Sequence, residues 1–122
     1  SIATPYHDPL NDHEVDFLST NGVETVKIAG LGIGAGGPHE YIQIAQVPAD
    51  EIKAHILSVD HPEAQAILIS CTDFPALELI AELEDKLGKP VITSNQATLW
   101  AALRVAGIAD RLENLGRLLE EY

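Results

Sequence analysis

Cys71 is the only cysteine of the 122-residue chain, and it follows directly on the apolar run AQAILIS. In the stretch LISCTDFP it stands where a buried strand ends and where a helix is expected to open at Phe74 and Pro75. Free N–H groups at a helix start favour a thiolate, and they equally favour a bound carboxylate. A thiol held there can donate or accept a proton at a carbon next to a carboxylate. The alternative is a small buried hydrophobe that ends a strand, and position alone supports both interpretations.

Polar side chains also end the neighbouring strands. Tyr6 closes the first apolar segment, where its phenol could bind a substrate carboxylate or could lie on the surface as an amphipathic side chain. Ser94 and Asn95 end the run PVITS and open the next helix, where N-capping is the simpler role. Two helix N-termini meeting at one crevice would also form an anion site.

The segment GLGIGAGG matches a dinucleotide-binding pattern through Gly32, Gly34 and Gly37. That pattern requires a helix to open directly at the glycines. Here Pro38 and HEYIQIAQV follow, and the next helical pattern appears only near Pro48. We therefore reject the dinucleotide hypothesis and expect a mobile loop over the site.

Four potential metal ligands lie close together in YHDPLNDHE, namely His7, Asp8, Asp12 and His13. Their spacing matches none of the usual zinc patterns. Acidic residues at a helix start are favoured by the helix dipole. We therefore interpret this stretch as a solvated helix start and predict no metal site.

The elements that must position these residues alternate regularly between strand and helix. Short apolar runs predict strands and 3.6-residue periodicity predicts helices, whereas the Gly-rich segment 34–47 is expected to be irregular. The expected strands are 2–4, 23–33, 64–70 and 90–94, and the expected helices are 9–20, 48–59, 74–88, 95–107 and 109–122.

This alternation predicts one α/β domain over residues 1–122, with a flavodoxin-like four-stranded parallel sheet flanked by helices. An apolar content of 46% supplies a core for a domain of this size. Ligands of such sheets bind beyond the carboxyl ends of the strands. Those are the ends at which Tyr6, Cys71 and Ser94 stand.

Composition excludes several classes of function. A formal charge of −12, from 7 basic and 19 acidic residues, argues against nucleic acid and against an anionic membrane surface as partners. No segment reaches the roughly 20 apolar residues that span a bilayer. A single cysteine fits a reducing compartment, so we expect a cytoplasmic protein. The chain has no methionine and opens inside a strand pattern, so we expect one lobe, the C-terminal half of a longer chain.

Three motifs, ATPY, ISCT and SNQATLW followed by AG, resemble those of maleate cis-trans isomerases and arylmalonate decarboxylases. These families form one branch of the Asp/Glu racemase superfamily, and the resemblance covers nearly the whole chain. It implies two similar α/β lobes with the active site between them, and neither cofactor nor metal. The expected partners are a small carboxylate or dicarboxylate substrate, and an N-terminal lobe or second subunit that completes the cleft. We also expect a homo-oligomer.

The resemblance also implies roles for individual residues. Cys71 matches the catalytic cysteine of the second lobe, and Tyr6 matches a tyrosine that contacts a substrate carboxylate. Thr72, with Asp73 beside it, falls where the family binds a substrate carboxylate. The expected catalytic residue is therefore Cys71, and the expected substrate-binding residues are Tyr6, Thr72 and Asp73.

The function implied is cofactor-independent acid/base or covalent cysteine chemistry, either maleate isomerase-like isomerisation or arylmalonate-type decarboxylation. An amino-acid racemase is one alternative. Another is a catalytically inactive carboxylate-binding lobe, since GAGGPHEYIQ lacks the asparagine that touches substrate in maleate isomerases. A redox-sensing domain is a third, and the chain offers it no second cysteine.

Overall fold

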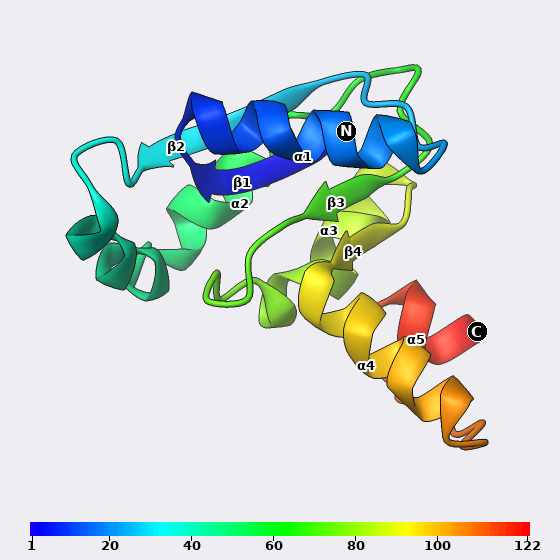
Figure 1. Cartoon of the computed structure of the whole chain (residues 1–122). Helices are drawn as coiled ribbons and strands as arrows, with labels where there is room; N and C mark the ends of the chain where they lie inside the picture. The colour runs from blue at the N-terminus through cyan, green and yellow to red at the C-terminus, as the bar shows by residue number, and fades with distance from the viewer.

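Four parallel strands form the centre of the molecule, in the order β2-β1-β3-β4 (Figure 1). The structure is a computed structural model that describes residues 1–122. The expected α/β fold, with a four-stranded parallel sheet flanked by helices, is confirmed. The strands are β1 (Ile2–Tyr6), β2 (Ile28–Ile33), β3 (Ile67–Ile69) and β4 (Val91–Thr93).

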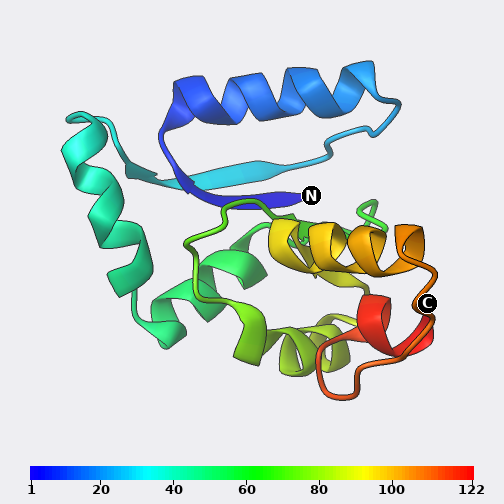
Figure 2. The same cartoon turned by 60° about the horizontal axis from the view of Figure 1, so that its bottom comes forward.

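Helices flank the sheet. Figure 2 shows α1 on one side of β1 and β2, with α2 and α3 on the other side. In Figure 1, α4 leaves the end of β4 and runs away from the sheet with α5 beside it. The α-helices are α1 (Asp8–Thr20), α2 (Ala49–Ser58), α3 (Ile80–Leu87), α4 (Ser94–Val105) and α5 (Arg117–Glu121), and the 3₁₀ helices are η1 (Pro38–Gln46) and η2 (Leu77–Leu79).

The hydrophobic core lies between the sheet and the α2–α3 layer. Burying each large aliphatic side chain there contributes about 1.5–3 kcal/mol. Since successive strand residues point to opposite faces, Ile67 and Ile69 enter this core whereas Leu68 between them faces the α1 side. The side chains with no exposed surface here are Ile52, Ile56, Val59, Ile67, Ile69, Ile80, Leu83 and Val91.

Buried polar contacts fix the carboxyl end of β1. The Thr4 hydroxyl donates to Asn11 Oδ1 in α1 at 2.5 Å and accepts from the Tyr6 N–H at 3.1 Å. On the other face, His55 Nε2 lies 2.8 Å from the Thr4 carbonyl oxygen. Pro5 has no N–H to contribute to the ladder, and the register shifts between Thr4 and Tyr6. Helices on both faces therefore hold the backbone that presents Tyr6.

Strand β2 is shorter than predicted. The expected strand 23–33 begins only at Ile28, since its neighbour β1 begins opposite that residue at Ile2. Residues 23–27 have no strand beside them to complete a ladder. Gly30 of β2 pairs with Thr4 of β1, and a Cβ there would overlap the Tyr6 carbonyl oxygen and the Asn11 amide.

The segment 34–47 is more regular than predicted. Nine residues of it form the 3₁₀ helix η1, and Ile44 is buried in the core. Glu40 fixes the turn before it, because its Oε2 accepts the N–H groups of Gly34 at 2.8 Å and Gly36 at 3.1 Å. These two hydrogen bonds hold the pKa of Glu40 below its ordinary value, and the one from Gly36 has the larger effect.

Two helix boundaries were predicted wrongly. The helix expected from Phe74 begins as α3 only at Ile80, after the short η2. Proline disfavours helical backbone at the residue before it, and Phe74 is instead buried in the core edge-on to His55. The helix expected over 109–122 is reduced to α5, because Gly116 takes a left-handed φ of 84° at its N-cap.

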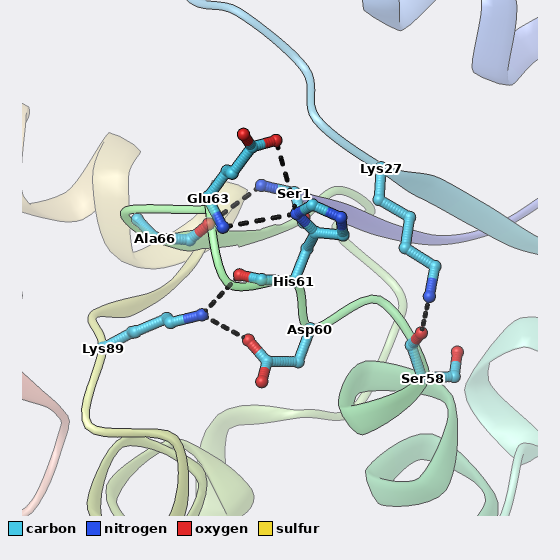
Figure 3. A network of polar contacts seen from close by, with 8 residues as sticks. All are labelled: Ser1, Lys27, Ser58, Asp60, His61, Glu63, Ala66 and Lys89. Carbon is cyan, nitrogen blue, oxygen red and sulfur yellow. Dashed lines mark hydrogen bonds and ion pairs between the residues drawn. The ribbon is translucent and has the colours of Figure 1, made fainter.

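The amino ends of the strands are joined by a polar network (Figure 3). Lys89 Nζ donates to Asp60 Oδ1 at 2.5 Å and to the His61 carbonyl oxygen at 2.7 Å. The Ser1 amino group donates to the Ala66 carbonyl oxygen at 2.9 Å. The hydrogen bond from Lys89 is the main reason that the pKa of Asp60 lies below its ordinary value. This network ties the loop before β3 to the loop before β4, at the sheet edge opposite Cys71.

Candidate active site

An open pocket of about 390 Å³ lies at the carboxyl edge of the sheet. The four residues predicted from the sequence all line it: Tyr6 at the end of β1, and Cys71, Thr72 and Asp73 after β3. Their common location follows from parallel strands, whose carboxyl ends meet at one edge. The other lining residues are Leu10, His13, Glu14, Tyr41 and Ile44.

Cys71 and Tyr6 both line this pocket. The cysteine is 7% exposed and makes no disulfide. Burial, together with a hydrogen-bonding contact to the Cys71 side chain, raises the pKa of Tyr6 above its ordinary value. The negative groups at Glu14 and Asp73 raise the pKa of Tyr6 further. Tyr6 is therefore a protonated hydrogen-bond donor at neutral pH, beside the only thiol of the chain.

The expected helix start next to Cys71 is not present. Because α3 begins at Ile80, residues 72–76 are not helical, and Thr72 and Asp73 form a turn instead. The Ala76 N–H donates to the Phe74 carbonyl oxygen at 2.8 Å across Pro75. The argument that a helix dipole at Phe74 stabilises the thiolate is therefore wrong. The surroundings of Cys71 are set by the pocket side chains.

Thr72 and Asp73 are exposed on this turn. Asn95, in the first turn of α4, donates its side-chain N–H to the Thr72 carbonyl oxygen at 3.0 Å. The expected N-cap at Ser94 or Asn95 is wrong, since Thr93 caps α4 and forms a capping box with Gln96. Asn95 is thereby free to hold the turn that carries Thr72.

Glu14 brings a carboxyl group to the pocket from α1. Ser70, the residue before Cys71, donates its hydroxyl to Glu14 Oε1 at 2.7 Å. Glu14 Oε2 is buried and has no hydrogen-bond partner. Burial is the largest effect on this carboxyl and raises the pKa of Glu14 above its ordinary value, against the opposing effects of Ser70 and His13.

Comparison with known proteins shows which family this chain belongs to. The family model for arylmalonate decarboxylase matches residues 1–119. The chain belongs to the arylmalonate decarboxylase family. It is 30% identical over 122 residues to an arylmalonate decarboxylase of Bordetella bronchiseptica, covering 99% of this chain and 50% of that protein. It is 26% identical over 120 residues to a maleate isomerase of Alcaligenes faecalis, covering 98% of this chain and 46% of that protein.

Solved structures agree with this assignment. A maleate isomerase variant from Pseudomonas putida S16, crystallised with maleate, superposes with a TM-score of 0.87 at 28% identity. The alignment covers 97% of this chain and 46% of that one. The chain thus has the fold of one lobe in the arylmalonate decarboxylase family, and spans about half the length of the curated relatives it matches.

Sequence reasoning missed the contribution of α1 to this site. Leu10, His13 and Glu14 are spaced at i, i+3 and i+4, which puts them on one helical face, and that face lines the pocket. The signal was present, but Glu14 sits in an acidic stretch that we interpreted as solvated. Tyr41 and Ile44 were missed because the segment that carries them was expected to be irregular.

Three further observations concern the rest of the chain. No group of three or more His, Cys, Asp or Glu side chains is arranged to hold a metal ion. No helix is both long enough and apolar enough to cross a membrane. A larger cavity of about 630 Å³ lies at the opposite edge of the sheet, among Ser1, Leu18, Leu68 and Ile92, and it contains none of the predicted site residues.

Proposed function

We propose that this chain is the thiol-bearing lobe of a cofactor-independent enzyme that acts on a small carboxylate. The reaction is decarboxylation of an arylmalonate type or cis-trans isomerisation of a maleate type, with Cys71 as the reacting group. The observation that carries this proposal is the position of Cys71 beside a protonated Tyr6 in an open pocket. Relatives that cover nearly all of this chain are an arylmalonate decarboxylase and a maleate isomerase.

In decarboxylation, the bond between the α-carbon and the departing carboxylate breaks and its electrons remain on the substrate as an enediolate. The Cys71 thiol then delivers its proton to the α-carbon and becomes a thiolate, which takes a proton from water before the next cycle. Hydrogen bonds from the Tyr6 phenol and the N–H groups near Thr72 stabilise the negative charge on the remaining carboxylate.

In isomerisation, the Cys71 thiolate adds to one alkene carbon and forms a C–S bond, while the alkene electrons move toward the adjacent carboxylate. The former double bond is then single and rotates. Expulsion of the thiolate restores the alkene in the trans arrangement. In a second version, a cysteine of the other lobe adds to the alkene, and Cys71 protonates the carbon that becomes negatively charged. Each version needs only protons and electron pairs held by thiol and substrate.

The open pocket and the partly exposed apolar side chains on α4 and on the α1 side of the sheet are surfaces that a partner lobe could cover. The pocket is open to solvent, and α4 exposes apolar side chains, with Leu99 45% and Val105 91% exposed. On the α1 side of the sheet, Leu68 and Ile92 line the larger cavity and remain partly exposed. An N-terminal lobe or a second copy of this chain would cover such surfaces and complete the cleft. A free thiol at the reacting position suits a reducing cytoplasm, where we propose that the protein works.

Replacement of Cys71 tests the assignment in the full-length protein that carries these residues. Cys71→Ala is expected to abolish turnover of phenylmalonate or maleate, whichever the wild-type protein converts, as followed by product formation. The chain offers no second thiol for comparison, so Ser58→Ala, at the end of α2 and outside the pocket lining, serves as the control. Activity that survives Cys71→Ala would remove the basis of the proposal.

A further inference from the structure

We propose that Glu14 binds a substrate carboxylate as a carboxylic acid, by donating a hydrogen bond from a proton that Oε2 takes up when the substrate enters. This inference rests on the proposed function, because it concerns the same pocket and a substrate with one or two carboxylates. It adds a residue of α1 to the substrate-binding groups and couples substrate binding to a proton.

The Glu14 carboxyl group is held at one oxygen and unpartnered at the other. The Ser70 hydroxyl donates to Oε1 at 2.7 Å, whereas Oε2 is buried and has no hydrogen-bond partner. A protonated carboxyl group has one O–H donor and keeps acceptor capacity. With its proton on Oε2, Glu14 accepts from Ser70 and still offers a donor. The terminal torsion of a glutamate is broad, so a small rotation turns this O–H toward the pocket that Glu14 lines.

The surroundings of Glu14 favour its uncharged form. Burial has the largest effect and raises the pKa of Glu14 above its ordinary value, while the hydrogen bond from Ser70 and the charge of His13 oppose this rise only in part. A carboxylate that enters the pocket raises the pKa of Glu14 further, because a neighbouring like charge disfavours ionisation. Substrate binding and protonation of Glu14 therefore strengthen each other.

No fixed cation lines the pocket to balance the charge of a substrate. Lysine and arginine are absent from the lining, and the titratable groups that face Glu14 there are His13, Tyr6, Tyr41, Cys71 and Asp73. A dicarboxylate beside an ionised Glu14 would be repelled. Uptake of one proton at Glu14 removes that repulsion and supplies a donor in the same step. The pocket thereby admits a dianion without a basic side chain of its own.

Tyr6 brings the substrate carboxylate to the same side of the pocket. The charge of Glu14 raises the pKa of Tyr6, so the two side chains lie close enough to interact. A carboxylate that accepts from the Tyr6 phenol through one oxygen can accept from Glu14 through the other. A hydrogen bond from a carboxylic acid to a carboxylate is charge-assisted, and is roughly twice as strong as a neutral one.

Proton uptake on binding tests this inference in the full-length protein. Cys71→Ala is the parent, so that no turnover occurs and no thiol titrates at this position. Isothermal titration calorimetry in buffers of different ionisation enthalpy gives the Kd and the number of protons bound. The two probes are fumarate and phenylmalonate, because both remain dianions over the neutral pH range.

Two substitutions are added to this parent. Glu14→Gln keeps an oxygen for Ser70 and places an amide N–H where the acid O–H stood, so it binds a carboxylate without taking up a proton. Asp16→Asn is the matched control, because it removes a negative charge from an exposed position of the same helix.

In the parent, the Kd is expected to rise by up to about tenfold for each pH unit above the pKa of free Glu14. Glu14→Gln should take up about one proton fewer on binding, with a correspondingly weaker dependence of the Kd on pH, and Asp16→Asn should behave as the parent does. Equal proton uptake in the parent and in Glu14→Gln would overturn the inference. So would an equal decrease in both variants, since net charge alone would then explain it.

The parent by itself provides a measurement that does not depend on the folding of Glu14→Gln. A Kd that stays constant or falls as the pH rises would refute the inference without any variant at this position. If neither probe binds to the parent, the proposed function fails as well. Binding without proton uptake overturns the role of Glu14 alone, and leaves the test of turnover by Cys71 untouched.

Discussion

The side chain of Asn95 donates a hydrogen bond of 3.0 Å to the carbonyl oxygen of Thr72, and so joins the first turn of α4 to the turn that follows Cys71. Two successive strand ends are thereby linked across the candidate site. The α4 end of this link is itself fixed by the capping box of Thr93 and Gln96. The bond is exposed, so its effect should fall on the mobility of the turn more than on global stability.

Asn95→Ala is expected to raise the rate at which iodoacetamide alkylates Cys71 severalfold, with a loss of only about 0.5–1.5 kcal/mol in the free energy of unfolding. Asn21→Ala is the matched control, because Asn21 also donates its side chain to a carbonyl oxygen, that of Phe17 at 2.8 Å, but lies at the far end of α1. Equal alkylation rates in the two variants would show that the link does not hold the turn.

Gly30→Ala should displace the end of β1. Its new methyl group would overlap the Tyr6 carbonyl oxygen and the Asn11 amide, and overpacking of this kind costs about 1–3 kcal/mol. Urea unfolding measures the loss. Gly107→Ala serves as the comparison, because Gly107 has open space around it and should lose only about 1 kcal/mol from its left-handed backbone. A Gly30→Ala protein as stable as the wild type would contradict the close approach.

Glu14→Gln should change the dependence of stability on pH. Burial raises the pKa of Glu14 in the folded state, so the folded protein holds this proton to higher pH than the unfolded chain does. The wild type therefore loses stability as the pH rises from the ordinary value of 4.5 through the raised folded-state pKa, and glutamine has no proton to lose.

The variant should accordingly gain unfolding free energy relative to the wild type across that window and keep the gain at pH 7. Chemical denaturation at a series of pH values measures the difference. Asp16→Asn, at an exposed position of α1, should show no comparable gain. A difference between wild type and Glu14→Gln that grows toward low pH would have the wrong sign.

Lys89→Met should loosen the amino edge of the sheet. It removes the two hydrogen bonds to Asp60 and to the His61 carbonyl oxygen, and we expect a loss of about 1 kcal/mol because the Lys89–Asp60 ion pair is partly exposed. Thermal unfolding at low and high salt measures this loss of stability. Lys86→Met, at an exposed position of α3, is the control and should change little.

The isolated chain should self-associate through its apolar surfaces. Sedimentation equilibrium is expected to show association that strengthens with added salt, because salt screens the repulsion between copies that each carry a formal charge of −12. Replacing Leu99 and Val105 with glutamate should shift the protein to monomer. A monomer at high protein concentration and high salt would contradict the prediction.

Much of the fold was predictable because the strands are marked locally by short apolar runs, and their parallel order brings Tyr6 and Cys71 to one edge. The predictions that failed concerned features that depend on contacts between residues far apart in the sequence. Phe74 looked like a helix start but is buried against His55, and β2 is shortened by the position of its neighbour. Glu14 was interpreted as solvated because its partner, Ser70, is 56 positions away along the chain and gives no local signal.

The pocket draws its thiol from the turn after β3 and its carboxyl group from the middle of α1. The hydrogen bond between them, from Ser70 to Glu14, joins two side chains, so a substitution on the pocket-lining face of α1 leaves the backbone around Cys71 in place. Descendants of such a lobe would change the lining of the pocket by single substitutions in the helix, while the thiol is inherited unaltered.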